Sequence, residues 1–417
     1  MFTQGLAADL IQSGRPWRLG LVDIDPAALA VAERLGRRMV EAKDADITIE
    51  ASLDRRDVLP QADVVVTTIG VGGRRAWETD VFIPRQFGVF QPVGDTVMAG
   101  GISRAMRMIP VMVAVARDLL ELCPQARFFN YANPMTVNCR AARRATGADI
   151  VGLCHGVFHV QRELAQLILA QPEETSCLAA GVNHFTWIYD LRRRGEDAWP
   201  AVRDRLAAER PAINPFSWSL FAAYGAYPAV NDRHVTEFFP ERFPSGQYHG
   251  KTLGVDVFSV ERTIANGDAI YERMRAQAHG EAPLDEAIFG RAAGEHEQLV
   301  EILDSIAGDK RRTYSANLPN RGAIPNLPSD AVLEMTCAAT GRGLLPLAMP
   351  DFPPVLAATL SRVIASQELT VEAALTGSRP LFVEALLADG CVNERAIAAR
   401  LADELLLAHK LHLPQFA

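Results

Sequence analysis

The sequence predicts an α/β fold in which a Rossmann-like, doubly wound parallel sheet is followed by a mixed α/β second domain with C-terminal helices. Three observations support this fold class. Helical and strand patterns alternate over the first 155 residues, residues 62–69 form a largely β-branched run typical of a buried parallel strand, and residues 355–411 are rich in Ala and Leu and read as helical. A chain of 417 residues is long enough for two domains, which we expect at residues 1–155 and 156–417.

The predicted elements of the first domain follow a βαβ rhythm. We expect a short amphipathic helix at 5–12, strands at 18–24, 62–69, 127–131 and 149–154, and helices at 26–42 and 104–122. Because the ligands of such sheets bind at the carboxyl ends of the strands, polar residues that follow these strands are the candidate site residues.

The pattern changes in the second domain. A helix is predicted at 157–170, and residues 178–192 alternate in the manner of an antiparallel strand. Residues 206–243 are rich in Pro and aromatic residues without a clear period, so we expect loops and short helices around a pocket there.

Composition limits the partners and the location. The net charge of −8 argues against a nucleic-acid-binding protein, which would carry a basic face. The six cysteines are scattered, which indicates a reduced, cytoplasmic protein without a disulfide framework. No apolar run approaches the roughly 20 residues of a membrane span, and the first residues lack the pattern of a signal peptide. We therefore expect a small-molecule substrate and no nucleic-acid or membrane partner.

An acidic residue, Asp23, ends the strand predicted at 18–24. At the end of the second strand of a dinucleotide fold, such an acid can bind both ribose hydroxyls of NAD, and its charge repels the extra phosphate of NADP. An exposed strand-end carboxylate without a ligand is the alternative interpretation.

The glycine-rich phosphate loop, which should precede that strand by about 20 residues, is not in the sequence. The chain opens in its first predicted helix, and Ser13-Gly14 at the end of that helix cannot replace the loop. Either the start codon was assigned late, or the pyrophosphate site has been lost. We favour a late start, because a sheet without its central strand would leave backbone groups unpaired. About 10 to 15 upstream residues would suffice for a strand and a tight turn.

Glycines follow the next buried strand and open the next helix. Gly70 and Gly72 would let the backbone approach a cofactor closely, although an ordinary βα loop has the same composition. Gly100-Gly101 precedes Arg104 by about one turn, and backbone N–H groups at such a helix start suit an anion or a hydroxyl-rich ligand.

Two asparagines stand at the carboxyl end of the strand at 127–131, namely Asn130 and Asn133. Pro134 disfavours the helical region for Asn133, so the amide of Asn133 can project into the crevice. An Asn-Pro turn without a ligand is the alternative.

Candidate metal ligands follow the last strand of the first domain. Cys154 and His155 end that strand, and Asn183 and His184 come later in the chain. Cys and His together bind a borderline divalent metal well, whereas a lone buried Cys is usually inert.

Two more polar clusters lie in the second domain. Residues 231–234 read Asn-Asp-Arg-His in an aromatic stretch, and Arg321 lies beside Asn317 and Asn320. Each cluster could line a pocket or form a surface turn.

Taken in order, these segments resemble one family. The motifs are VGG at 71–73, GGI with Arg104 at 100–104, NYANPM at 130–135, GLCHG at 152–156, GVNHFTW at 181–187 and NLPNRGAI at 317–324. Together they resemble glycoside hydrolase family four, the NAD-dependent α-glucosidases, α-galactosidases, uronidases and phospho-glycosidases. The resemblance covers nearly the whole chain, and it is specific because several motifs keep a fixed order.

The resemblance implies a lactate-dehydrogenase-like fold with NAD and Mn²⁺, or another divalent metal, as cofactors. It implies that Cys154 and His184 are the metal ligands and that Asn133 binds the substrate. With this assignment we expect a homodimer or homotetramer. The other expected contacts are Arg104, Asn183 and Arg321 for the substrate, and Asp23, Gly70, Gly72 and Asn130 for the cofactor.

The implied reaction cleaves a glycoside through transient oxidation, outside the usual two-carboxylate mechanism. NAD⁺ takes a hydride from C3 of the sugar, and the resulting ketone, polarised by the metal, acidifies the C2 proton. A base removes that proton, the C1 leaving group is eliminated, water adds, and NADH returns the hydride. The cofactor is therefore regenerated in each turnover.

Departures from the family pattern point to the substrate. Phospho-glycosidases carry Asp or Asn where this sequence has His155, and an Arg where it has Trp77. Both differences favour a non-phosphorylated sugar, and the Cys-His-Gly form resembles the uronidases, so we expect an α-galacturonide or α-glucuronide. The family's base aligns poorly here, and the candidate catalytic residues are His155, Asp232 and His234.

Two other functions compete with this interpretation. A plain NAD-dependent 2-hydroxy-acid dehydrogenase would share the Rossmann ancestry, but it would consume NAD⁺ stoichiometrically and would not need Cys154 together with His184. A non-catalytic relative without the cofactor loop would bind a sugar and release none. Glycoside cleavage without net formation of NADH distinguishes the three.

Overall fold

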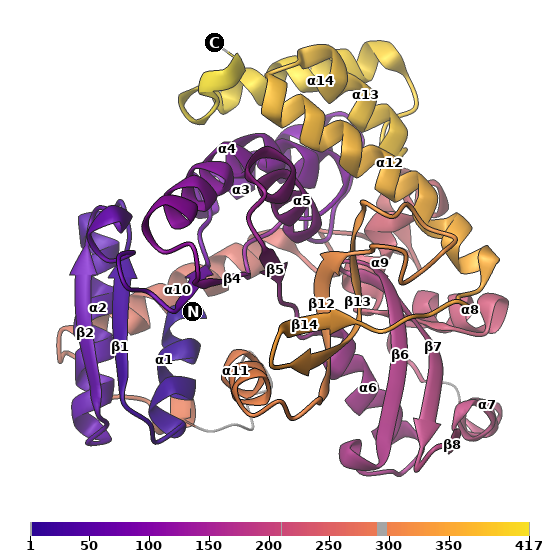
Figure 1. Cartoon of the computed structure of the whole chain (residues 1–417). Coiled ribbons are helices and arrows are strands. Elements are labelled where there is room, and N and C mark those ends of the chain that lie inside the picture. The colour runs from indigo at the N-terminus through magenta and orange to yellow at the C-terminus, as the bar shows by residue number, and fades with distance from the viewer. Residues whose placement is uncertain (1, 210, 290–297, 417) are drawn as a thin grey trace.

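A ten-stranded mixed sheet runs through the centre of the molecule, with helices on both of its faces (Figure 1). The structure is a computed structural model that describes residues 2–209, 211–289 and 298–416. The main order of the large sheet is β3-β4-β5-β12-β13-β6-β7-β8, and β9 and β14 pair beside this path.

Residues 2–52 form a small α/β layer that lies beside the large sheet (Figure 1). Its strands pair in parallel, and in the described part of the chain neither of them pairs with β3. The second helix begins where the sequence predicts, because Asp25 accepts hydrogen bonds from two N–H groups of the first turn. The elements are α1 (Phe2–Gln12), β1 (Trp17–Val22), α2 (Pro26–Ala42) and β2 (Ile47–Ser52).

Three parallel strands at one end of the large sheet carry the rest of the predicted βαβ rhythm. Their carboxyl ends are level, since Thr67 pairs with Asn130 and Asn130 with Gly152. The elements are β3 (Val64–Thr67), α3 (Gly73–Gln86), α4 (Met98–Leu122), β4 (Arg127–Asn130), α5 (Met135–Thr146) and β5 (Ile150–Gly152).

Helix α4 begins six residues earlier than the predicted helix at 104–122. The preceding loop folds back on the first turn of the helix, and only glycine leaves room for it there. A Cβ on Gly100 would lie 2.6 Å from the carbonyl oxygen of Gly94. A Cβ on Gly101 would lie 2.3 Å from the carbonyl carbon of Thr96. This helix is also long and apolar enough to span a membrane by length and composition, which the sequence analysis did not anticipate, but most of its apolar stretch is buried inside the protein.

The other half of the large sheet is antiparallel and includes a hairpin that the sequence analysis missed. The strand predicted at 178–192 is wrong as one element: it is two strands joined by a turn at Asn183 and His184, and His184 adopts a left-handed φ of 68°. A Cβ on Gly181 would lie 2.2 Å from the carbonyl oxygen of Phe185, so glycine is required beside this turn. The strands are β6 (Thr175–Val182), β7 (Phe185–Arg193), β8 (Glu196–Asp197), β9 (Tyr227–Ala229), β12 (Thr313–Pro319), β13 (Val332–Thr340) and β14 (Gly343–Pro346).

Among the remaining elements, α6, the short helices between residues 206 and 243 and the helices from α12 to α14 agree with the predictions, whereas α10, α11, β10 and β11 were not predicted. The C-terminal helices cover α4 and α5 at one end of the molecule (Figure 1). The elements are α6 (Gly156–Leu167), α7 (Trp199–Ala208), α8 (Pro215–Tyr224), α9 (Asp232–Val235), the 3₁₀ turn η3 (Thr236–Phe238), β10 (Gln247–Tyr248), β11 (Lys251–Thr252), α10 (Val260–Ala278), α11 (Leu299–Ala307), α12 (Pro354–Thr376), α13 (Arg379–Asp389) and α14 (Arg395–Ala408).

The large sheet continues across residue 155, the predicted domain boundary. Strand β5 pairs with β12, and one buried apolar cluster extends from α4 to α14. The carboxyl ends of the parallel strands therefore face the β6–β7 turn, which has consequences for the site. The division into residues 1–155 and 156–417 stays a prediction.

Candidate active site and metal centre

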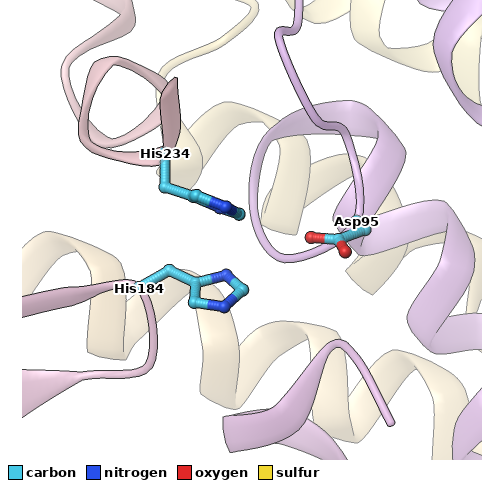
Figure 2. A group of neighbouring side chains, drawn as sticks. All are labelled: Asp95, His184 and His234. Carbon is cyan, nitrogen blue, oxygen red and sulfur yellow. The ribbon is translucent and has the colours of Figure 1, made fainter. Parts of the chain in front are cut away.

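Three potential metal ligands meet in one place. A carboxylate oxygen of Asp95 and ring nitrogens of His184 and His234 all lie within 4.8 Å of one another. Figure 2 shows the two imidazole rings and the carboxylate turned toward a common point. Asp95 comes from the loop before α4, His184 from the β6–β7 turn and His234 from α9, so the fold assembles this metal group from three distant segments.

Hydrogen bonds around Thr96 determine which nitrogen of His184 can bind a metal. The Thr96 hydroxyl lies 2.6 Å from Oδ1 of Asp95 and 2.9 Å from Nδ1 of His184. An ionised carboxylate can only accept, so the hydroxyl donates to Asp95, and Nδ1 of His184 must donate to the hydroxyl. His184 therefore carries its proton on Nδ1 and presents the lone pair of Nε2, as metal-binding histidines commonly do.

The electrostatics of the group suit a divalent cation. Burial would raise the pKa of Asp95, but the nearby His184, Arg104 and His234 outweigh burial and lower that pKa to about 2. Burial lowers the pKa of His184 to about 4, and burial together with the neighbouring His184 lowers the pKa of His234 well below its usual value. Two neutral imidazoles and one carboxylate are nitrogen and oxygen donors that bind Mn²⁺ or a similar divalent ion.

Polar atoms without partners surround the metal group. Within the described ranges, the buried Nδ1 of His234, Oδ1 of Asn133 and Nε of Arg233 have no hydrogen-bond partner in the protein. Native proteins leave few buried polar atoms unpaired, so several at one place indicate a site completed by a ligand. The residues present therefore fit a bound metal together with a polar substrate.

Two predicted substrate-binding residues lie beside the metal group. Asn133 donates from Nδ2 to Oδ2 of Asp95 at 3.0 Å, and Arg104 donates from Nε to the backbone carbonyl of Asn133 at 3.0 Å. Asn183 precedes His184 and donates to Glu334 at 3.1 Å, while its own Oδ1 has no partner among the described residues. Asn133 and Arg104 thus flank the group, and Asn183 supports the turn that carries His184.

The segment of Cys154 and His155 lies next to this site. His155 contributes to the lowered pKa of both His184 and His234, so it is their electrostatic neighbour. The Sγ atom of Cys154 accepts a hydrogen bond from the N–H of Gly156 at 3.4 Å. Cys154 is not a member of the three-residue metal group, and its role as a metal ligand stays a prediction.

Two predicted site residues are occupied by the fold itself. All the near partners of the buried Asp232 carboxylate are donors: the N–H groups of Phe216 and Ser217, the Ser217 hydroxyl and the Tyr248 hydroxyl, at 2.5 to 2.9 Å. Asp232 therefore caps the start of α8, and these contacts argue against the prediction that it is a base.

The side chain of Asn130 is likewise occupied, because it accepts from Thr67 and from the N–H of Ala132 and donates to the carbonyl of Ala132. It shapes the turn after β4, and its role in binding the cofactor stays a prediction.

The remaining predicted residues lie at strand ends or on the surface. Asp23 is exposed at the end of β1 and accepts from the N–H of Asp25 at 2.9 Å. Gly70 follows β3, where a Cβ would lie 3.4 Å from the Arg104 guanidinium, and Gly72 starts α3 with a φ of 79°. Arg321 is exposed in a turn after β12, so the prediction that it binds the substrate has no support from its position.

Asp95 was not among the residues predicted from the sequence, although a signal was present. Asp95 is the single charged residue between Arg85 and Arg104, in a stretch rich in Gly, Val and Phe. An isolated acid in an apolar segment is costly to bury without a partner, and this cost could have identified it as functional. His234 was predicted as catalytic, and the structure places it in the metal group.

Fold and site together define a Rossmann-type enzyme with a metal-binding site beside the carboxyl ends of its parallel strands. Comparison with known families identifies it further. The Family 4 glycosyl hydrolase model matches residues 9–170, and the model of the C-terminal domain of that family matches residues 179–392. The chain belongs to family 4 of the glycosyl hydrolases.

Individual relatives agree with this assignment. An α-galactosidase of Rhizobium meliloti is 32% identical over 439 residues, covering 100% of this chain and 87% of the relative. An α-galacturonidase of Bacillus subtilis is 28% identical over 431 residues, covering 97% and 94%. The structure of a 6-phospho-α-glucosidase from gut microorganisms, in complex with NAD and Mn²⁺, has a TM-score of 0.86 at 19% identity and covers 100% of this chain and 97% of that one.

These comparisons confirm the family, the fold class and the glycoside hydrolase activity predicted from the sequence, and they agree with the predicted cofactors. The plain dehydrogenase and the non-catalytic sugar-binding protein are thereby set aside. The names of the relatives include galactosidases, a glucosidase and galacturonidases, so they do not single out one sugar.

Proposed function

We propose that this enzyme hydrolyses a non-phosphorylated hexuronide, such as an α-galacturonide, with NAD and Mn²⁺ or another divalent metal as cofactors. The observation that carries the proposal is the group of a buried His184 with the half-buried Asp95 and His234, bordered by unpaired polar atoms of Asn133 and Arg233. When bound, NAD supplies a hydride acceptor and the metal supplies a Lewis acid.

In this proposal each residue of the site has a separate role. Asp95, His184 and His234 would hold the metal, and Cys154 would be a further ligand. The free Oδ1 of Asn133 accepts a hydrogen bond from a sugar hydroxyl. His155, the electrostatic neighbour of both histidines, is our candidate to take the C2 proton, since the Asp232 carboxylate is already held by four donors.

The strand-end residues would bind the cofactor. Asp23 is exposed at the end of β1, where it would meet the ribose, and the glycine loop after β3 lies against Arg104. The absence of a side chain at Gly70 leaves space there for a cofactor phosphate or nicotinamide ribose. NAD is thereby proposed to lie across the ends of β1, β3 and β4.

Charge supports a uronic acid over a phosphorylated sugar. Arg104 interacts electrostatically with Asp95 and Arg233 with His184, and Nε of Arg233 is unpaired within the described residues. One guanidinium can bind a planar carboxylate through two hydrogen bonds, whereas a phosphate usually recruits more cations. The indole of Trp77 donates to the carbonyl of Val93 at 2.7 Å, so the position where phospho-sugar enzymes carry an Arg is used here to hold the loop of Asp95.

A neutral α-galactoside is the second candidate, favoured by the 32% identity to an α-galactosidase. The experiment compares kcat/KM for a galacturonide, the matching galactoside and its 6-phosphate with NAD⁺ and Mn²⁺ present. We expect the galacturonide to lead, and Arg233→Gln to lower kcat/KM for the galacturonide more than for the galactoside. A lead of the galactoside or the 6-phosphate by more than about tenfold, roughly 1.4 kcal/mol, would overturn the uronide proposal and leave the family unchanged.

We also propose that the enzyme acts in the cytoplasm as a homo-oligomer. In the described part of the chain no disulfide joins any of the six cysteines, in line with a reducing compartment.

A further inference from the structure

Glu237 is a buried acid that no part of the proposed reaction uses. It lies in η3, three residues after His234, and only 1% of its surface is exposed. Its Oε1 accepts hydrogen bonds from the backbone N–H groups of Val93 and Gly94, both at 2.8 Å. These two residues directly precede Asp95, so one side chain connects the segment of His234 to the loop of Asp95.

The side chains of the Asp95 loop make other contacts, since Thr96 bonds to Nδ1 of His184 and Asp95 accepts from Asn133, but few side chains hold the backbone of this loop. The indole of Trp77 binds the carbonyl of Val93, and Asp389 accepts from the N–H of Met98 at 3.1 Å where the loop becomes α4. Gly94 has a left-handed φ of 66° between these points, so the local backbone does not hold the loop by regular secondary structure. Among the described hydrogen bonds from other segments to the backbone of residues 93–98, those of Glu237 alone start on a segment that also carries a member of the metal group, because Trp77 lies in α3 and Asp389 in α13.

We propose that Glu237 is a positioning residue that sets the distance between Asp95 and His234 and thereby prepares the metal group for its ion. The inference rests on the metal site of the proposed function. In the described chain Glu237 makes no hydrogen bond to any of the three ligand side chains, and its Oε2 has no hydrogen-bond partner. Its effect on the metal therefore passes through the backbone of Val93 and Gly94.

Substitutions at Glu237 separate positioning from charge. Burial raises the pKa of Glu237 to about 8, with Asp95 and Asp389 as further acids nearby, so the neutral amide of Gln resembles its native form. Glu237→Gln keeps an oxygen for both N–H groups. Glu237→Ala removes the acceptor, and Glu237→Asp shortens the side chain by one methylene. Both substitutions therefore release the loop. Glu241→Gln, at an exposed acid four residues further on, is the matched control.

The experiment measures the Mn²⁺ dissociation constant of the full-length enzyme by electron paramagnetic resonance, with the visible spectrum of the Co²⁺ form as a second readout. The Tm without metal reports whether each variant is folded. We expect Glu237→Gln and Glu241→Gln to bind Mn²⁺ like the native enzyme. Glu237→Ala and Glu237→Asp should bind at least about tenfold more weakly and change the Co²⁺ spectrum, as for other residues that support metal ligands.

Native Mn²⁺ affinity in folded Glu237→Ala, or weak binding by Glu237→Gln equal to that of Glu237→Ala, would overturn the inference. Where Glu237→Ala fails to fold, native affinity in Glu237→Asp would overturn it. Failure of the native enzyme itself to bind Mn²⁺ would instead overturn the metal site of the proposed function.

Discussion

At the scale of single residues, the site depends on side chains that orient other side chains. Thr96 donates to Asp95 and accepts from His184, so one hydroxyl sets the tautomer of the histidine and the orientation of the carboxylate. Asn133 donates to the other carboxylate oxygen of Asp95 and leaves its own oxygen free. Such supporting hydrogen bonds commonly change metal affinity by about 10- to 100-fold.

Replacing Thr96 tests this arrangement. Thr96→Val keeps the shape of the side chain but removes the hydroxyl, so Nδ1 of His184 loses its acceptor and Asp95 loses a donor. We expect Mn²⁺ affinity to fall by about 10- to 100-fold, measured by titration calorimetry. Thr96→Ser keeps the hydroxyl and should retain most of the affinity. Equal affinity in the Val and Ser variants would contradict the proposed tautomer of His184.

Cys154 supplies a second test at this scale. As a predicted ligand, its thiolate should not be replaceable by a hydroxyl, which binds this class of ion far more weakly. Cys154→Ser is therefore expected to abolish glycoside hydrolysis and to weaken Mn²⁺ binding without lowering Tm by more than a few degrees. Native Mn²⁺ affinity in this variant would show that Asp95, His184 and His234 are sufficient.

Residue-scale prediction from the sequence reached residues that stand in a motif and could not reach those that only the fold brings to the site. His184 and Asn133 stand in recognisable segments, and both lie at the site. Asp95 has no neighbouring ligand in the sequence, because its partners come from other segments of the chain. Asp232 stands in the polar cluster 231–234 beside His234 of the metal group, yet its own carboxylate binds the start of α8.

At the scale of elements, buried carboxylates hold the segments that carry the site. Glu334 accepts from Asn183 and Thr186 on either side of the β6–β7 turn, and Asp232 holds the start of α8. Asp80 binds Arg107 through two hydrogen bonds in a pair that is almost fully buried and joins α3 to α4. These contacts connect irregular segments to regular ones, which long loops around a pocket require.

Asp232→Asn distinguishes a helix cap from a catalytic base. The amide group of Asn cannot accept from all of the N–H and hydroxyl donors of Phe216, Ser217 and Tyr248, so a donor is left unpaired. We expect a loss of about 1–3 kcal/mol in stability, seen as a lower Tm, with an unchanged pH profile of kcat. An unchanged Tm with loss of activity would restore Asp232 as the base.

Asp389 at the end of α13 gives a dependence of stability on pH. Burial raises its pKa from 3.8 to about 6, so between these values the folded state binds more protons than the unfolded state. The contribution of Asp389 to the free energy of unfolding therefore falls as pH rises through this window, by at most about 3 kcal/mol.

Asp389→Asn cannot titrate and still accepts from the N–H of Met98. Its Tm relative to the native enzyme should be higher at pH 7 than at pH 4, measured by differential scanning calorimetry. A difference in Tm that is constant from pH 4 to pH 7 would contradict the raised pKa.

Element boundaries could be predicted where local chemistry determines them. Helix α2 matches its prediction, since an Asp cap and a proline mark its first turn. The turn between β6 and β7 was missed because residues 179–188 are buried on both faces, so alternation gives no sign of a break. The start of α4 was missed because two glycines disfavour a helix by propensity and are retained for close packing.

At the scale of the whole molecule, one continuous sheet brings the two halves of the site together. The parallel strands β3, β4 and β5 present Gly70 and Asn133 at their carboxyl ends, and the antiparallel strands β6 and β7 present His184 on the facing turn. A cofactor at the ends of the parallel strands and a metal at the β6–β7 turn would lie on either side of the same sugar. This arrangement is the physical basis of the proposed reaction, which needs a hydride acceptor and a Lewis acid at adjacent carbons.

The most direct test follows the hydrogen at C2 of the sugar. The galacturonide is hydrolysed in D₂O with NAD⁺ and Mn²⁺, and the released sugar is analysed by NMR. Removal of the C2 proton by a base followed by addition of water predicts deuterium at C2, no net formation of NADH, and loss of turnover when the metal is removed by EDTA. Release of a sugar that retains protium at C2 would contradict the account.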